Sequence, residues 1–356
     1  MLKKIIISLL AISLLIGCGS DKSIKKNELV TATAFDKNST DTIFKAMDKF
    51  PKNVQLSIAK IIDGKVHYYG ALYSDDSITT IENHTNTFII GSLTKLFTST
   101  LLAQMHIDGK IGLNDDIQAN LPFSLATTPA ISYQQLANHS SGLSKDVDDE
   151  EEFDTSSRAD LENYLKHDLV LKYKQGTFHY SNTGMATLGY LISIIENKSY
   201  EKLLQEQIFN KLDMHHSTTI RANTQSTRVP ALMSNDDPVS EAYKSVGGIL
   251  SSVEDLYKFS LAFFGDSPEY LLTQKETLKQ DTSRGVGLGW FINTNTNTDT
   301  NQTLYSHGGI VEGYRSVIIL DKDKQNGIII LSNLPIYNNL GDISKLGREL
   351  MKKIGK

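Results

Sequence analysis

Residues 88–95 read FIIGSLTK and are the most informative stretch of this 356-residue chain. A short apolar run ends in a glycine, and apolar side chains then recur at helical spacing from 93 to 102. We therefore expect a helix that begins near Ser92 and stops at Gly109. Ser92 and Lys95 would share one face of its first turn.

A serine and a lysine placed in this way can perform nucleophilic chemistry. A serine hydroxyl needs a nearby base, and a lysine serves as one only when its pKa falls well below ~10.4. The free N–H groups at a helix start can stabilise an anion on a substrate oxygen. The pattern S-x-x-K also begins at Ser23, Ser57 and Ser199, which we place in a polar tether, a strand and a helix cap. Context therefore selects Ser92 and Lys95.

The segments around this helix predict a sheet made from both ends of the chain. The expected elements are a helix over 41–50, strands over 54–59 and 65–72 joined at Asp63-Gly64, strands over 287–293, 314–320 and 327–331, and a helix over 341–353.

The middle of the chain is mostly helical, with its clearest helices over 184–196 and 199–212. We therefore expect an α+β fold (an α/β sandwich). An antiparallel sheet flanked by helices would comprise 41–112 and 236–356, and 113–235 would be an inserted helical region. Together they would form one catalytic unit, 41–356.

Two further segments carry candidate site residues. Tyr180 lies in a loop before an apolar helix, and a nearby lysine could lower its pKa so that it exchanges protons with a substrate. Asn182 could hold the substrate through its amide. Taken alone, Tyr180 is more often a core or surface aromatic.

The other segment is His307-Gly308-Gly309, which precedes a predicted strand. Its glycines allow close approach of a substrate, and a strand N–H after them could complete an oxyanion hole. The alternative is a glycine-rich bend with an exposed histidine.

These three elements, in this order, resemble the penicillin-recognising serine hydrolases of the class C β-lactamase type. The group includes class C β-lactamases, D-alanyl-D-alanine carboxypeptidases, D-aminopeptidases and esterases. The resemblance covers nearly all of residues 50–335. It extends to 136–143 (LANHSSGL), to 247–252 (GGILSS) with Asp255-Leu256, and to 287–290 (GLGW).

The resemblance implies a β-lactamase/transpeptidase-like fold and a role for each site residue. Ser92 would be the acylated nucleophile, Lys95 would help to deprotonate it, and Tyr180 would be the general acid and base. Asn182 would orient the substrate amide, and the N–H groups of Ser92 and Ile310 would form the oxyanion hole.

The chain departs from this family at the third element. Many β-lactamases have Lys-Thr-Gly where this chain has His307-Gly308-Gly309. A lysine attracts a substrate carboxylate, whereas a histidine is mostly neutral near pH 7. Members with H-x-G include carboxypeptidases, aminopeptidases and esterases. We therefore expect D-amino-acid peptides (D,D-carboxypeptidase-like) or esters as substrates, with true class C-like β-lactamase activity as the alternative. If His307 titrates in the cleft, activity will change between pH 5 and 8.

Composition and missing motifs exclude other classes. The net charge of −5, with 36 Lys+Arg against 41 Asp+Glu, supplies no basic field for nucleic acid, and a single cysteine cannot form an internal disulfide. No G-x-S-x-G marks an α/β-hydrolase. The nine histidines lack H-x-x-x-H spacing, so we expect no metal and no cofactor. The acidic run 146–154 is expected to be a solvated loop rather than a calcium site. A non-catalytic binder of cell-wall peptides or penicillin is the alternative of another class.

The N-terminus has the features of a targeting segment. Residues 1–18 read MLKKIIISLLAISLLIGC, with two lysines before an apolar stretch too short to span a bilayer comfortably. The LIGC ending resembles the lipobox of bacterial lipoproteins, in which the cysteine is lipidated and the preceding peptide is removed. An ordinary secretory signal is the alternative. We expect a signal peptide over 1–17, lipidation at Cys18 and a solvated tether over 18–40. The protein would then be anchored to a membrane of the cell envelope, on its extracytoplasmic side.

Overall fold

The computed structural model describes residues 25–126, 130–146, 157–224, 226–232, 239–295, 302–311, 313–335 and 342–354. The predictions for residues 1–24, including Cys18, lie outside this part of the chain. So do those for the acidic run beyond Asp146.

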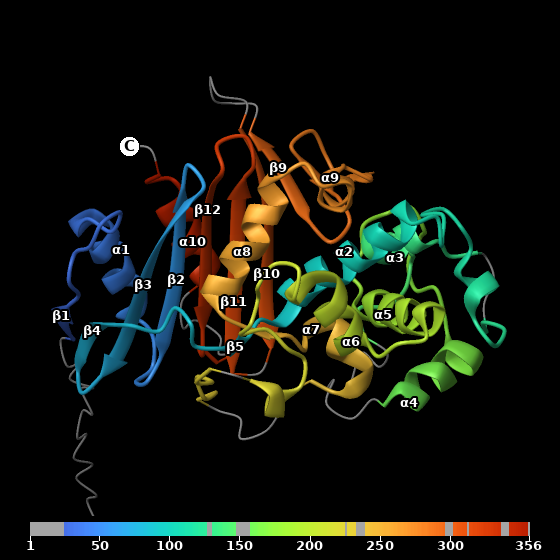
Figure 1. Ribbon diagram of the computed structural model, residues 1–356, viewed down its shortest axis with the longest axis horizontal. Helices are drawn as coiled ribbons and strands as arrows, with labels where there is room; N and C mark the ends of the chain where they lie inside the picture. The colour runs from blue at the N-terminus through green and yellow to red at the C-terminus, as the bar shows by residue number, and fades with distance from the viewer. Residues whose placement is uncertain are drawn as a thin grey trace, which may run out of the picture.

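A ten-stranded sheet runs through the described part of the chain (Figure 1). Its strand order is β1-β4-β3-β2-β12-β11-β10-β9-β8-β7, and every pair is antiparallel except the short β1–β4 pair. The strands are β1 (Lys26–Glu28), β2 (Gln55–Ile62), β3 (Lys65–Ser74), β4 (Ser77–Ile81), β7 (Leu278–Lys279), β8 (Arg284–Val286), β9 (Phe291–Asn295), β10 (Gln302–Val311), β11 (Tyr314–Asp321) and β12 (Asn326–Ser332).

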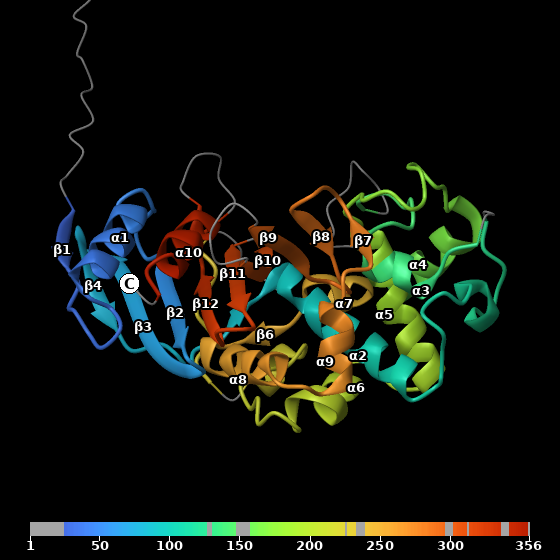
Figure 2. The ribbon, with the colours of Figure 1, turned by 90° about the horizontal axis from the view of Figure 1, so that it is seen from above.

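The two ends of the chain meet in the middle of this sheet. Strand β2 pairs with β12, where Ile58 lies opposite Ile330. All of β12 is buried, because helices cover both faces of the sheet. In Figure 2, α1 (Lys37–Met47) and α10 (Ile343–Met351) lie over one face and α8 (Val253–Phe264) over the other. This confirms the predicted fold class.

The remaining helices gather beside the sheet. They are α2 (Thr94–Ile107), α3 (Tyr133–Ala137), α4 (Arg158–Asn163), α5 (Asn182–Glu196), α6 (Tyr200–Leu204), α7 (Lys244–Gly247) and α9 (Pro268–Gln274). Short helical turns are Gly91–Leu93, Ile117–Asn120, Tyr164–Asp168, Gln205–Phe209, Arg221–Asn223 and Glu241–Tyr243. Helix α2 packs against α7 and α9, which lie in the same predicted sheet region, and against α5 of the predicted helical region. A two-strand pair, β5 (Phe88–Ile89) with β6 (Leu250–Ser251), leads into α2.

Two elements differ from the expected ones. Helix α1 begins at Lys37 rather than at 41, because the Asp36 side chain accepts a hydrogen bond from Ser39 N at 2.9 Å and caps it. Within the segment predicted as a solvated tether, β1 pairs with β4, Phe35 is fully buried and Lys60 Nζ donates to Ala34 O, so part of this segment contacts the sheet.

The second difference concerns the predicted strand over 287–293. Gly287 N donates to Trp290 O, which makes 287–290 a bend, and β9 begins only at Phe291. Trp290 is fully buried against Phe263, so this bend anchors the start of β9 in the core.

None of the helices in the described ranges combines the length and apolar character needed to cross a bilayer.

Candidate active site

Ser92 and Lys95 are brought together at the start of α2. Ser92 lies in the turn Gly91–Leu93, and Lys95 in the first turn of the helix. Lys95 Nζ is 2.8 Å from Ser92 Oγ, and the lysine is fully buried. Burial holds the pKa of Lys95 well below its usual value, an effect that Asp146 opposes and Lys145 reinforces. A buried amine of this kind can lose its proton near neutral pH and act as a base.

A backbone carbonyl orients this amine. Lys95 Nζ also lies 3.0 Å from Val246 O, at the C-terminal side of α7. Because a carbonyl only accepts, one N–H of the lysine is directed at Val246. In the neutral amine this contact fixes the rotation about Nζ, so that the lone pair is available to the proton of Ser92.

Tyr180 completes the group. Its ring centroid lies 5.1 Å from Lys95 Nζ, and a hydrogen-bonding interaction with the Ser92 side chain acts on its hydroxyl. Burial raises the pKa of Tyr180 above its usual value, and the Ser92 interaction offsets only part of this increase. The expected lowering of its pKa is therefore wrong, because desolvation of the phenolate outweighs the other effects. Tyr180 is a protonated phenol that can donate a proton.

Asn182 begins α5 beside this cluster. Its Nδ2 donates to Asp146 Oδ1 at 2.9 Å, and its backbone N donates to Lys145 O at 2.7 Å. Its Oδ1 is buried and has no hydrogen-bond partner within the described structure. Such an oxygen is an available acceptor for a substrate N–H.

His307 is buried on β10, and its hydrogen bond defines its tautomer. Nδ1 lies 2.7 Å from Gly308 O, which can only accept, so Nδ1 carries the proton and Nε2 is a bare acceptor. Burial, with a smaller contribution from Lys95, lowers the pKa of His307 to about 3. The ring is therefore uncharged from pH 5 to 8. The condition set for a pH effect of His307 between pH 5 and 8 is therefore not met.

Two glycines let β10 approach the Ser92 turn. Gly91 has a φ of +52°, and a Cβ on it would lie 3.0 Å from Ile310 N. A Cβ on Gly309 would lie 2.2 Å from Ile90 O. The Ser92 turn and β10 thus come close together beside Ile310, where the predicted oxyanion hole would lie. Pairing of β10 with β9 ends at Ser306, opposite Phe291, which leaves 307–311 paired with β11 alone among the described strands.

Comparison with known families identifies the chain. The family model described as Beta-lactamase matches residues 42–343. The chain belongs to the β-lactamase family. This is a family of penicillin-recognising serine hydrolases, which agrees with the resemblance seen in the sequence.

Curated relatives of this β-lactamase-family chain are distant. Protein flp of Staphylococcus aureus (strain MRSA252) is 26% identical over 310 residues, which cover 78% of this chain and 59% of the relative. Beta-lactamase-like protein 2 of Dictyostelium discoideum is 27% identical over 279 residues, covering 70% of this chain and 50% of the relative. The chain thus spans less than two thirds of the length of these relatives.

Solved structures share the fold. "Beta-Lactamase/D-Alanine Carboxypeptidase from Pseudomonas syringae" superposes with a TM-score of 0.76 at 20% identity, covering 91% of this chain and 100% of that one. "A class C beta-lactamase" gives 0.75 at 20% identity, covering 91% and 97%. The octameric penicillin-binding protein homologue from Pyrococcus abyssi gives 0.72 at 22% identity, covering 87% and 75%.

His139 is a site residue to which the sequence pattern assigned no role, although it lies in the LANHSSGL motif. Its ring packs 4.4 Å from that of Tyr180. Its Nδ1 accepts from Ser181 N at 3.2 Å, so in the neutral ring Nε2 carries the proton. Burial lowers the pKa of His139 well below its usual value. The histidine therefore supports the loop that carries Tyr180.

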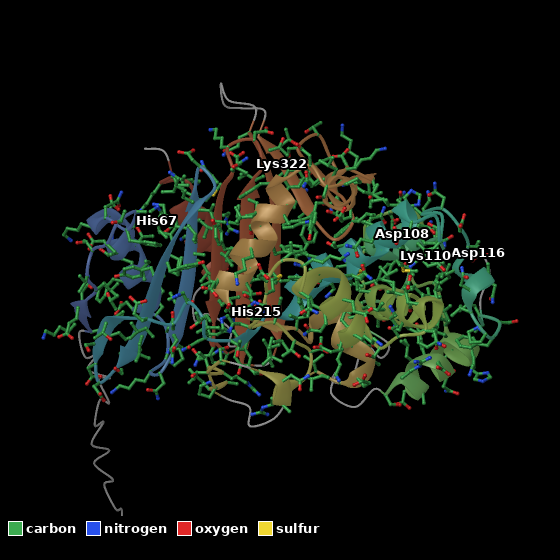
Figure 3. All side chains as sticks on the ribbon, in the orientation of Figure 1. His67, Asp108, Lys110, Asp116, His215 and Lys322 are labelled. Atoms are coloured by element: carbon green, nitrogen blue, oxygen red, sulfur yellow. The ribbon has the colours of Figure 1, made fainter. Side chains whose placement is uncertain are left out.

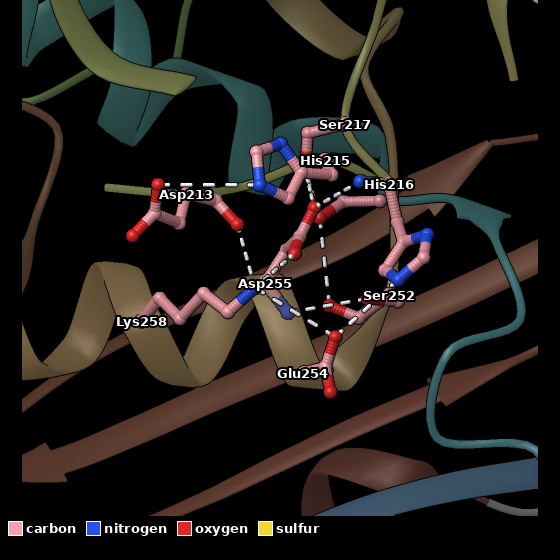
Figure 4. A network of polar contacts seen from close by, with 9 residues as sticks. Asp213, His215, His216, Ser217, Ser252, Glu254, Asp255 and Lys258 are labelled. Atoms are coloured by element: carbon pink, nitrogen blue, oxygen red, sulfur yellow. Dashed lines mark hydrogen bonds and ion pairs between the residues drawn. The ribbon is translucent and has the colours of Figure 1, made fainter. Parts of the chain in front are cut away.

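A polar network joins the first turn of α8 to residues 216–217 (Figure 4). The buried Asp255 carboxylate accepts from His216 N at 2.7 Å and from Ser217 Oγ at 2.8 Å, and it pairs with Lys258 Nζ at 3.3 Å. Ser217 Oγ in turn lies 2.9 Å from Ser251 Oγ on β6. Because β6 pairs with β5, the network supports the strand that leads into the Ser92 turn.

His67 on β3 and His215 after the Gln205–Phe209 turn are well separated in Figure 3. Across the described ranges, no three His, Cys, Asp or Glu side chains gather as metal ligands. The reactive groups that the fold does bring together are the serine, lysine and tyrosine.

Proposed function

We propose that this chain is a lipid-anchored serine hydrolase of the cell envelope that works through a Ser92 acyl-enzyme. Its substrates would be D-amino-acid peptides, as for a D,D-carboxypeptidase, or esters. The observation that carries the proposal is the buried Lys95 amine 2.8 Å from Ser92 Oγ. Membership of the β-lactamase family supports the reaction type.

Acylation would begin with transfer of the Ser92 proton to the neutral Lys95 amine. Ser92 Oγ then bonds to the substrate carbonyl carbon, and the negative charge moves to the carbonyl oxygen between the N–H groups of Ser92 and Ile310. Tyr180, a protonated phenol, gives its proton to the leaving nitrogen or oxygen. The Lys95 ammonium returns a proton to Tyr180, which leaves the amine neutral again.

Deacylation would reverse these roles. A water molecule gives a proton to the neutral Lys95 amine as its oxygen bonds to the acyl carbon, and the resulting ammonium returns this proton to Ser92 Oγ as the acyl group leaves. No step changes oxidation state, so no cofactor is needed.

The neutral His307 favours a carboxypeptidase or esterase over an efficient β-lactamase. A lysine at this position would attract the carboxylate of a β-lactam, whereas His307 presents a bare, uncharged Nε2. A true class C-like β-lactamase is the second candidate, because the same Ser92, Lys95 and Tyr180 would open a β-lactam ring.

The proposal is tested by intact mass after treatment with a fluorophosphonate. The wild-type protein should gain one adduct, and Ser92→Ala should gain none. Ser199→Ala is the matched control, because Ser199 also begins an S-x-x-K sequence but caps α6. A wild-type protein without adduct would favour a non-catalytic binder of cell-wall peptides or penicillin.

Parallel assays with nitrocefin, a short-chain nitrophenyl ester and a D-Ala-D-Ala peptide then identify the substrate class. Tyr180→Phe should slow hydrolysis of the best of these three substrates by ~10²–10⁴, the usual contribution of a positioned acid or base.

The anchor needs its own experiment. The charged start, apolar stretch and LIGC ending of residues 1–18 support lipidation at Cys18. We expect the expressed wild-type protein to partition with membranes and Cys18→Ser to be lost from them, as measured by fractionation and mass spectrometry. Membrane retention of Cys18→Ser without an added lipid mass would contradict the anchor and leave the hydrolase proposal unaffected.

A further inference from the structure

We propose that Tyr200 and Thr98 are positioning residues for Lys95, acting through the backbone of α7. The inference rests on the proposed function, because it concerns the base of that reaction. Neither side chain touches Ser92 in the structure. Both belong to a chain of hydrogen bonds that ends at the segment which holds the lysine amine.

Helix α2 is fastened to the segment 245–249 by three consecutive contacts. Thr98 Oγ1 donates to Ser245 O at 2.6 Å, Lys95 Nζ donates to Val246 O at 3.0 Å, and Ile249 N donates to Thr94 Oγ1 at 3.3 Å. The hydrogen bond from Lys95 Nζ to Val246 O is therefore the middle one of the three. Its position depends on the contacts on either side.

The direction of the Thr98 hydrogen bonds can be assigned. Thr98 Oγ1 has one proton and lies near two carbonyls that can only accept, Ser245 O at 2.6 Å and Thr94 O at 3.3 Å, and the proton is directed at the much closer Ser245 O. Tyr200 OH, 2.7 Å from Thr98 Oγ1, must then be the donor of that pair. The chain runs from the Tyr200 hydroxyl through the Thr98 hydroxyl to the Ser245 carbonyl. Burial raises the pKa of Tyr200, which keeps this phenol protonated as the chain requires.

The Ser245 and Val246 carbonyls move together. Both belong to α7, and consecutive carbonyls of a helix point in the same direction along its axis. Ser245 is also held from the other side, where a Cβ on Gly189 of α5 would lie 2.2 Å from Ser245 Cβ. Ser245 is thus held between α5 and Thr98. Loss of the Thr98 contact lets the turn rotate and withdraws Val246 O from Lys95.

The consequence concerns the solvation of the amine. Burial is the main cause of the lowered pKa of Lys95, and a displaced Val246 would admit water beside Nζ. Water stabilises the ammonium form, so the base would lose its proton only at higher pH. The acid limb of kcat/KM, which reports a base in the free enzyme, would move in the same direction.

The experiment compares pH profiles of full-length variants with the substrate that the parallel assays select. Tyr200→Phe and Thr98→Val should each lower kcat about tenfold, the size of one hydrogen bond, and move the acid limb to higher pH. KM should change less than twofold, because neither side chain contacts Ser92. Thr98→Ser keeps the hydroxyl and should restore the wild-type profile. The double variant should lose no more than Thr98→Val alone, since both act through one chain.

Tyr133→Phe is the matched control for loss of a buried tyrosine hydrogen bond. Tyr133 is fully buried on α3, and its hydroxyl accepts from Asn120 Nδ2 at 2.9 Å. Its profile should coincide with that of the wild type, and melting temperatures show whether each variant is folded. If Tyr200→Phe and Thr98→Val have the wild-type acid limb, or if Tyr133→Phe moves it equally, the inference is overturned. Retention of activity by Ser92→Ala would instead overturn the proposed function.

Discussion

At the scale of single residues, the site is defined by two buried histidines of opposite hydrogen-bonding polarity. His307 presents a bare Nε2 because its Nδ1–H is directed at Gly308 O. His139 presents an Nε2–H because its Nδ1 accepts from Ser181 N. Neither Nε2 has a partner within the described structure, and the two rings lie 6.3 and 4.4 Å from that of Tyr180.

These histidines predict acid instability. In the unfolded chain both rings take up protons as the pH falls below about 6.5, whereas burial lowers their folded pKa values, for His307 to about 3. Their stabilising contribution is complete above pH 6.5 and is lost as the pH falls. Each ring adds up to about 1.4 kcal/mol per pH unit to this loss.

Denaturant unfolding between pH 6.5 and 5 measures the slope. His307→Gln removes one of the groups that take up a proton on unfolding. The free energy of unfolding should therefore fall less steeply with decreasing pH, by the slope that corresponds to about one proton. His215→Gln is the control, because the His215 side chain is 62% exposed. Equal slopes for His307→Gln and the wild type would show that His307 is protonated in the folded state.

The helix start at Ser92 was enough to predict the Ser92–Lys95 pair, because residues three positions apart share one face of a helical turn. The acceptor of Lys95 was not predictable, because Val246 lies 151 positions away along the chain. The tautomer of His307 depends on its own carbonyl contact, and the raised pKa of Tyr180 on burial by distant segments. Sequence patterns identified the reactive side chains but not the surroundings that set their protonation.

At the scale of elements, α8 supports the site through its first turn. The Asp255 carboxylate accepts hydrogen bonds from His216 N and Ser217 Oγ and pairs with Lys258 (Figure 4). Asp255→Ala leaves His216 N, Ser217 Oγ and Lys258 Nζ without this acceptor. We expect a loss of about 1–3 kcal/mol in the free energy of unfolding for each buried donor left without an acceptor.

Urea denaturation of Asp255→Ala tests this expectation. Asp266→Ala removes a carboxylate whose side chain is 94% exposed and should leave the midpoint unchanged. An Asp255→Ala midpoint equal to that of the wild type would mean that the network contributes nothing to stability.

Element types were predicted better than element ends. Helix α5 begins at Asn182 rather than 184, because the Ser181 side chain accepts from Gly184 N and caps it. The predicted helix over 199–212 is divided into α6 and the turn Gln205–Phe209, a change of backbone winding that apolar periodicity does not reveal. Capping side chains and such local changes depend on tertiary contacts as much as on spacing.

At the scale of the whole molecule, the sheet and the helical region meet where β10 passes the Ser92 turn. Gly309 is the point of closest approach, since a Cβ on it would lie 2.1 Å from Ser316 Oγ and 2.2 Å from Ile90 O. Gly309→Ala should therefore push β10 away from Ile90, with a cost of about 1–3 kcal/mol and loss of activity. The neighbouring Gly308 has open space, because a Cβ on it would lie 3.9 Å from its nearest neighbours.

Gly308→Ala is thus a matched control on the same strand. Thermal melting should separate the two variants, with Gly308→Ala near the wild type and Gly309→Ala melting at a lower temperature. Similar melting of the two variants would show that β10 accommodates a methyl group at position 309 beside Ile90.

The pairing of β2 with β12 has a consequence for biosynthesis. Gln55 N donates to Asn333 Oδ1, 278 positions away in the sequence. The two paired strands, β2 and β12, thus come from opposite ends of the chain. The central sheet cannot close until the last strands have left the ribosome, and pairings this distant in sequence form slowly. The central sheet therefore stays open while the polypeptide is being made, and for a chain exported as proposed above this open state is the one that a secretion channel accepts.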